Sequence, residues 1–125
     1  MNPIIKEALR YLSNAKEILE EKAIRENGIY LDQKYIKMAG HTAFCGVLHA
    51  LDKLVTTQSK SKRKSVEFYR EFLGKYDKKM LTNFNDIYTI LHLGLGSDGV
   101  ADAVIIKRGM AMTKEFIDKI AARLN

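Results

Sequence analysis

The chain has 125 residues, one cysteine and a net charge of +6, and 46% of its residues are hydrophobic. A chain of this length can bury enough surface to fold without a metal ion or a disulfide, so we expect residues 1–125 to form a single domain. No apolar stretch approaches the roughly 20 residues that span a bilayer, and the charged N-terminus lacks the apolar segment of a signal peptide. We therefore expect a cytoplasmic protein that does not contact a membrane.

The first half of the chain carries two helical patterns, in which hydrophobic residues recur every three or four positions. The first pattern predicts a helix over residues 3–25 that ends at Asn27-Gly28. Asp32 can cap a second helix, which we expect to run to about Val55.

The second half continues in the same way. Ser65 can cap a third helical segment, which we expect to continue to Leu95. Gly74 is the position at which this segment can divide in two. The strand-like run of residues 87–93 keeps the helical period, so we expect it to be helical. The run from Gly94 to Val100 breaks the period, and a last helix follows, traced by Ile106, Met110, Thr113, Phe116, Ile117, Ile120 and Leu124. Without alternating strand patterns and with short loops, the chain is predicted to be an all-α antiparallel bundle of four or five helices.

A basic loop separates the second helix from the third. It contains Lys60, Lys62, Arg63 and Lys64 and no acidic residue. Such a cluster can attract phosphates or acidic proteins by long-range electrostatics, so these residues are candidates for anion binding. The alternative is an ordinary solvated loop.

The second helix has an apolar side and an opposite side that carries His41, Cys45, His49 and Asp52. Histidine and cysteine four residues apart can share a metal ion, but His41 and His49 are separated by about 12 Å of helix, too far for one ion. Two of these residues could bind an ion with further ligands from elsewhere, but the sequence has no second pair like that of a zinc finger, so we predict no metal site. A nucleophilic role for Cys45 is also not expected, because free cysteines in helical cores are usually inert. The histidines are expected to line a groove or to form ordinary hydrogen bonds.

Glycines at residues 94–99 have the G-x-G-x-x-G spacing of dinucleotide-binding loops. That function requires a preceding strand and a parallel sheet, and the run before these glycines is helical. We therefore expect no cofactor here and a simple turn between two helices, with a ligand-contacting loop that includes Asp98 as the alternative. Tyr88 and His92 are four residues apart and could share a hydrogen-bond partner near this loop, or join two helices of the bundle.

Three runs resemble helices of the HEPN superfamily. The run HTAFCGVLHALDKLV at residues 41–55 resembles its Ala-rich helix, and EALRYLSNAKEILEEKA at 7–23 and MTKEFIDKIAARL at 112–124 are similar to other helices of that bundle. The whole length also resembles a small group of bacterial proteins of unknown function, with similar stretches to KMAGHTAFCGVL at 37–48 and ILHLGLGSDGV at 90–100.

The HEPN resemblance implies a small bundle, often dimeric, that is either a metal-independent endoribonuclease or a non-catalytic binding module. The nucleases share an arginine and a histidine with four to six residues between them, and no histidine of this chain has an arginine at that spacing. Lys34 stands seven residues before His41, and Asn85 seven before His92, but lysine lacks the bidentate fork of a guanidinium. A nuclease is therefore not the leading prediction.

We predict a non-catalytic, HEPN-like module that forms a homodimer and binds a protein or RNA partner. Two alternatives remain: a divergent endoribonuclease that uses His41 or His92 as general acid or base, and a scaffold that only associates with another chain. The candidate groove residues are His41, Cys45, His49, Tyr88, His92 and Asp98.

Overall fold

The computed structural model describes residues 2–58 and 65–124. Most of these residues lie in five α-helices, two π-helical segments and one short ribbon of two strands. The prediction of an all-α bundle is confirmed. In chain order the elements are α1 (Pro3–Ile18), η1 (Leu19–Ala23), β1 (Arg25–Glu26), β2 (Ile29–Tyr30), α2 (Gln33–Gln58), α3 (Val66–Tyr76), α4 (Lys78–Ile87), η2 (Tyr88–Ser97) and α5 (Ala103–Arg123).

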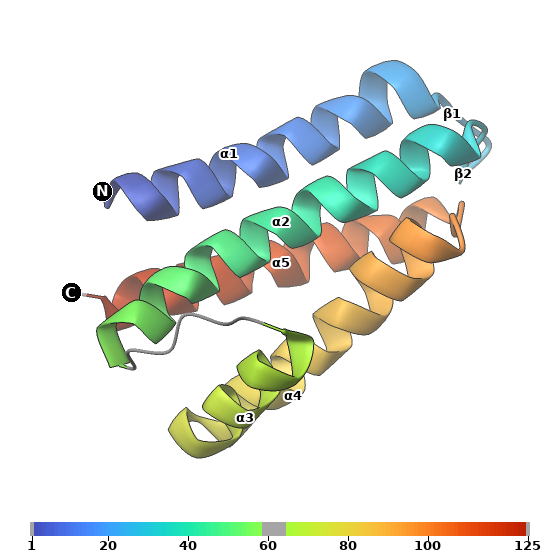
Figure 1. The fold of residues 1–125 in the computed structure, drawn as a ribbon. Helices are drawn as coiled ribbons and strands as arrows, with labels where there is room; N and C mark the ends of the chain where they lie inside the picture. The colour runs from blue at the N-terminus through green and yellow to red at the C-terminus, as the bar shows by residue number, and fades with distance from the viewer. Residues whose placement is uncertain (1, 59–64, 125) are drawn as a thin grey trace.

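Helix α2 is the central element, and it packs against α1, η2 and α5. Figure 1 shows α1, α2 and α5 lying alongside one another, with α4 and η2 forming one continuous run that crosses below them. Helix α2 runs opposite to α1, and α5 runs opposite to the continuous run of α4 and η2 (Figure 1). In the part of the chain that the structure describes, no helix is long and apolar enough to cross a bilayer.

Side-chain caps mark the starts of the α-helices. Asn2 accepts a hydrogen bond from the second residue of α1 at 2.7 Å, and Asp102 accepts two at the start of α5. The predicted caps are confirmed: Asp32 accepts a hydrogen bond from the Lys34 amide at 3.2 Å, and Ser65 accepts one from Phe68 at 3.1 Å. Each cap satisfies an amide that has no partner within its helix.

The third segment divides at Asp77 and not, as predicted, at Gly74. Asp77 has an extended backbone and its carboxylate accepts hydrogen bonds from the amides of Lys79 and Met80, so it ends α3 and begins α4. Gly74 lies inside α3, where its place in the helix needs no special backbone conformation.

The first helix ends earlier than predicted and is followed by a hairpin. Ile24 has a positive φ of 54°, which stops the helix after Ala23. Asn27 and Gly28 have φ values of 53° and 79°, the conformation of a tight hairpin turn, and they connect β1 to β2. This hairpin is tied to the start of α5, because the Ala103 amide donates to the Gly28 carbonyl at 2.9 Å.

The glycine-containing segment is helical where a turn was predicted. Helix η2 continues through Gly94 and Gly96 to Ser97, and the turn comes only at Gly99, whose φ is +63°. Tertiary contact explains this difference, because Gly96 lies directly against α2 and a side chain there would collide with His41. Close helix packing thus outweighs the low helix propensity of glycine.

The core is organised around an aromatic residue of α4. The ring of the fully buried Phe84 lies 6.1 Å from Phe44 of α2, 6.2 Å from Tyr69 of α3 and 6.3 Å from Phe116 of α5, measured between ring centroids. One side chain therefore contacts three other helices, which fixes α3 and α4 relative to α2.

Candidate functional site

Four flat polar side chains from three helices lie in a line on the surface of the bundle. The guanidinium carbon of Arg70 is 4.8 Å from the centre of the Tyr88 ring, and the Tyr88 ring stacks on His92 with 5.0 Å between centroids and 27° between planes. His92 in turn meets His41 edge-on, with 5.6 Å between centroids. We call Arg70, Tyr88, His92 and His41 the Arg70–His41 row.

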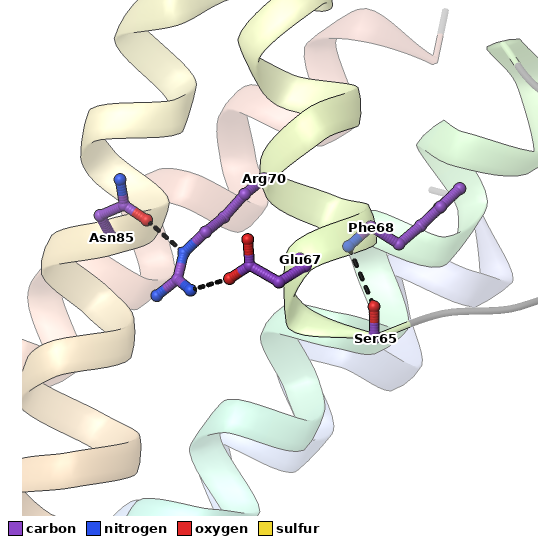
Figure 2. Close-up of polar contacts among 5 residues, drawn as sticks. All are labelled: Ser65, Glu67, Phe68, Arg70 and Asn85. Atoms are coloured by element: carbon purple, nitrogen blue, oxygen red, sulfur yellow. Dashed lines mark hydrogen bonds and ion pairs between the residues drawn. The ribbon is translucent and has the colours of Figure 1, made fainter.

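Arg70 is held in place from both ends of its guanidinium group. Its Nε donates a hydrogen bond to the side-chain oxygen of Asn85 at 2.9 Å, and a terminal nitrogen lies 2.6 Å from a carboxylate oxygen of Glu67 (Figure 2). The Arg70 side chain is still 31% exposed. Exposed ion pairs of this kind add little to the stability of the fold. The main effect of these two contacts is to orient the Arg70 guanidinium, which stays partly exposed to solvent.

The histidine end of the row rests on apolar and glycine neighbours. Phe44, which is buried, lies 5.7 Å from Tyr88 and 5.3 Å from His92 between ring centroids. A Cβ atom at Gly96 would stand 2.8 Å from the Cε1 atom of His41. Because glycine has no such atom, His41 can lie against η2 and reach His92.

One ring nitrogen of the row lacks a partner within the protein. Among the described residues, nothing donates to or accepts from the buried Nδ1 atom of His92. A buried polar atom without a hydrogen bond costs about 1–3 kcal/mol, and native structures contain few of them. The buried Nε2 atom of His49 also lacks a partner among the described residues.

The row combines groups that recognise anions and planar rings. It offers one permanent positive charge, a phenol and two imidazoles, and of these rings the His41 imidazole is the exposed one. Guanidinium groups bind phosphates and carboxylates, and flat side chains stack on nucleobases.

The structure brings together three of the six residues predicted to line a groove: His41, Tyr88 and His92. Cys45 is exposed one helical turn after His41. His49 lies a further turn along, where its ring is 5.8 Å from that of Tyr11 on α1. The contacts of the Arg70–His41 row bridge α2, α3 and η2, and the wider groove of six residues stays a prediction.

The remaining predicted residues lie elsewhere or outside the described chain. Asp98 follows η2, and its backbone carbonyl accepts a hydrogen bond from Gln33 at 3.2 Å. In residues 2–58 and 65–124, no three histidine, cysteine or acidic side chains are grouped so as to hold a metal ion. The predicted anion-binding residues Lys60, Lys62, Arg63 and Lys64 lie outside the described residues.

Arg70 and Phe44 belong to the site and were not predicted from the sequence. Arg70 precedes Tyr88 by 18 positions, and only the corner between α3 and α4 brings the two together. No motif spacing indicates such a contact. Phe44 follows His41 by three residues, so the helical period could have placed it beside the histidine.

A partly buried hydrogen bond joins α3, which carries Arg70, to α2. The Tyr69 hydroxyl donates to the carboxylate of Asp52, and Tyr69 is only 3% exposed. Burial raises the pKa of Tyr69 above its ordinary value of 10.0, and the hydrogen bond and negative charge of Asp52 raise it further. The phenol therefore stays protonated as a donor.

Fold and site together define the class: a small all-α bundle that carries a row of cationic and aromatic side chains across three helices. The comparisons place it more closely. The chain belongs to the DUF5618 family, described as a domain of unknown function, which matches residues 4–122.

A solved structure is similar over almost the whole length. It is a protein of unknown function from Dyadobacter fermentans, 44% identical, with a TM-score of 0.89 over 98% of this chain and 96% of that one. None of the curated proteins matches.

Proposed function

We propose that this chain is a non-catalytic, HEPN-like binding module that contacts single-stranded RNA through the Arg70–His41 row. The observation that carries the proposal is the continuous contact from the Arg70 guanidinium through Tyr88 and His92 to His41. RNA is favoured over a protein partner because its phosphates and unstacked bases match the charge and the flat side chains of the row. The net charge of +6 would add a long-range attraction.

We expect the residues of the row to contact different parts of the RNA. Arg70 would bind a phosphate, since its orientation is already set by Glu67 and Asn85. The exposed His41 would contact a base or ribose edge, and Tyr88 and His92 would support it. Because these side chains are already packed on one another, little rotamer freedom would be lost on binding.

A titration of short single-stranded RNA, followed by fluorescence anisotropy, tests the proposal. Affinity should fall between about 50 and 200 mM salt, with a slope of about −0.7 in log–log form for each phosphate contacted. Recovered RNA should keep its length. Absence of binding at the lower salt would refute the proposal and make a protein partner the better candidate.

The second candidate is a metal-independent endoribonuclease, and the pairing of His41 with His92 favours it. Two imidazoles at a centroid distance of 5.6 Å could act on opposite sides of one phosphodiester as general base and general acid. This candidate predicts RNA cleavage that resists EDTA and is abolished by His41→Ala and by His92→Ala. Intact RNA after long incubation would exclude it. We rank it second because no arginine precedes either histidine at the nuclease spacing.

The proposal also includes the expected homodimer and cytoplasmic setting. A dimer would present two copies of the row to one RNA strand and raise the effective affinity without new contacts. Light scattering after size-exclusion chromatography measures the mass directly, and a monomer at working concentration would remove this part of the proposal.

A pure scaffold would bind another protein whether or not the row is intact.

A further inference from the structure

An open pocket lies at the hairpin end of the bundle and shares no residue with the Arg70–His41 row. It has a volume of about 320 Å³ and lies between α1, η1, β1, β2 and α5. Figure 1 shows these segments meeting where α1 ends and α5 begins. The floor is aliphatic, formed by the buried side chains of Leu19, Ile106 and Met110, and Tyr30 lines the pocket as well. The size falls within the range of small-molecule sites.

Three cations from three separate elements surround this apolar floor. Lys16 comes from α1, Arg25 from β1 and Lys107 from α5, and Glu20 is the one acidic residue in the lining. Three positive charges and one negative charge leave a net charge of +2. None of the three cations forms an ion pair with another residue in 2–58 or 65–124. Their charges are therefore available to a bound anion.

The pocket is built into ordered backbone. The Tyr30 amide donates to the Ala101 carbonyl at 2.9 Å, and the Ala103 amide donates to the Gly28 carbonyl at 2.9 Å, so the hairpin is fastened to α5. The side chain of Asp102 already accepts hydrogen bonds from the next two amides of α5. An anion would therefore be held by side chains and not by the helix terminus.

We propose that this pocket binds a small amphipathic carboxylate, a function separate from the proposed contact with RNA. The aliphatic body of the ligand lies on Leu19, Ile106 and Met110. Its carboxylate lies among Lys16, Arg25 and Lys107, where guanidinium and ammonium groups donate charge-assisted hydrogen bonds. The apolar floor distinguishes this ligand from a bare inorganic anion, and the cationic rim distinguishes it from a neutral lipid.

Octanoate is a suitable probe, and the methionine methyl groups report where it binds. In carbon-13 NMR of methyl-labelled methionines, octanoate should shift the signal of Met110, which lines the pocket, and leave that of the buried Met80 in place. Octanol, octylamine and inorganic phosphate each lack one part of the required chemistry and should bind at least about 10-fold more weakly. A Met110 signal unmoved at about 10 mM octanoate would overturn the proposal, as would equal affinity for any of the other three probes.

A pair of double variants tests the role of the rim. Lys16→Gln/Lys107→Gln removes two charges from the pocket, and Lys6→Gln/Arg108→Gln removes two exposed charges from the same helices outside it. The first should weaken octanoate binding about 10-fold, whereas the control should leave it nearly unchanged. All four positions are exposed, so circular dichroism should show both proteins folded. Equal weakening in the two variants would overturn the assigned site.

Discussion

Gly40 of α2 lies directly against η2, and replacing it with alanine should destabilise the protein. A Cβ atom there would stand 2.6 Å from the Cβ of Leu95, 2.7 Å from the carbonyl oxygen of Leu91 and 2.8 Å from the amide nitrogen of Gly96. Non-bonded carbon atoms prefer about 3.5–4.0 Å, so α2 and η2 would have to separate by about 1 Å. Two of the three atoms belong to the backbone, and a change of rotamer cannot relieve the collision.

The expected loss of stability follows from two opposing terms. Overpacking of this kind costs about 1–3 kcal/mol, and the upper end applies where backbone must move. Alanine recovers about 1 kcal/mol of helix propensity relative to glycine. The net prediction for Gly40→Ala is a loss of about 2 kcal/mol in the free energy of unfolding, or about 8 °C in Tm for a chain of this size.

Gly74→Ala is the matched control. A Cβ at Gly74 would meet only the Leu81 side chain, at an ordinary 3.6 Å, so the same substitution should stabilise α3 by about 0.5–1 kcal/mol. Urea denaturation followed by circular dichroism measures both variants against the unmodified protein. A Gly40→Ala protein as stable as the unmodified one would refute the close contact between α2 and η2.

Three further predictions concern single side chains. Asp77→Ser keeps a cap on α4 but removes the hydrogen bond from Arg123 that lowers the pKa of Asp77. The stability difference from the unmodified protein should be present above pH 4 and vanish as pH falls through the lowered pKa. Urea denaturation from acid to neutral pH measures this difference, and a constant difference would contradict the prediction. Tyr69→Phe should lower the free energy of unfolding by about 1–2 kcal/mol at neutral pH. Because the pKa of Tyr69 is raised in the folded protein, the contribution of the hydroxyl is fully present below pH 10 and is lost as pH rises toward that raised pKa. A variant of unchanged stability at neutral pH would contradict the role of the hydroxyl. Gly96→Ala should displace the His41 ring, whose Cε1 would lie 2.8 Å from the new Cβ, and should lower stability because the Leu91 carbonyl oxygen would lie at 3.1 Å. Unchanged histidine ring signals in NMR would count against the described contact.

Local signals in the sequence predicted the fold class and several boundaries. Helical periodicity identified the α-helices, and side chains that can cap an amide placed two helix starts at Asp32 and Ser65. The corner at Asp77 was missed, because neither proline nor glycine marks it and the hydrophobic period runs through it. The Asn27-Gly28 pair is a known hairpin signal, but strands of two residues are too short to show alternation.

The candidate site depends on contacts between distant parts of the chain, and this limited its prediction. The spacing of Tyr88 and His92 places both on one face of a helix, and His41 was identified separately on α2. That these two groups meet depends on how α2 packs against η2, which no local pattern encodes. Arg70 joins them through the corner between α3 and α4, so its role emerged only from the folded chain.

The most direct test of the account compares RNA binding by two arginine variants. Arg70 pairs with Glu67, and Arg10 pairs with Glu7 at the same spacing on α1, so Arg70→Gln and Arg10→Gln remove the same charge and the same type of ion pair. Arg70→Gln should bind RNA about 10-fold more weakly and with a salt slope reduced by about 0.7, whereas Arg10→Gln should change little. Equal affinities of the two variants for RNA would contradict the assignment of the Arg70–His41 row as the binding site.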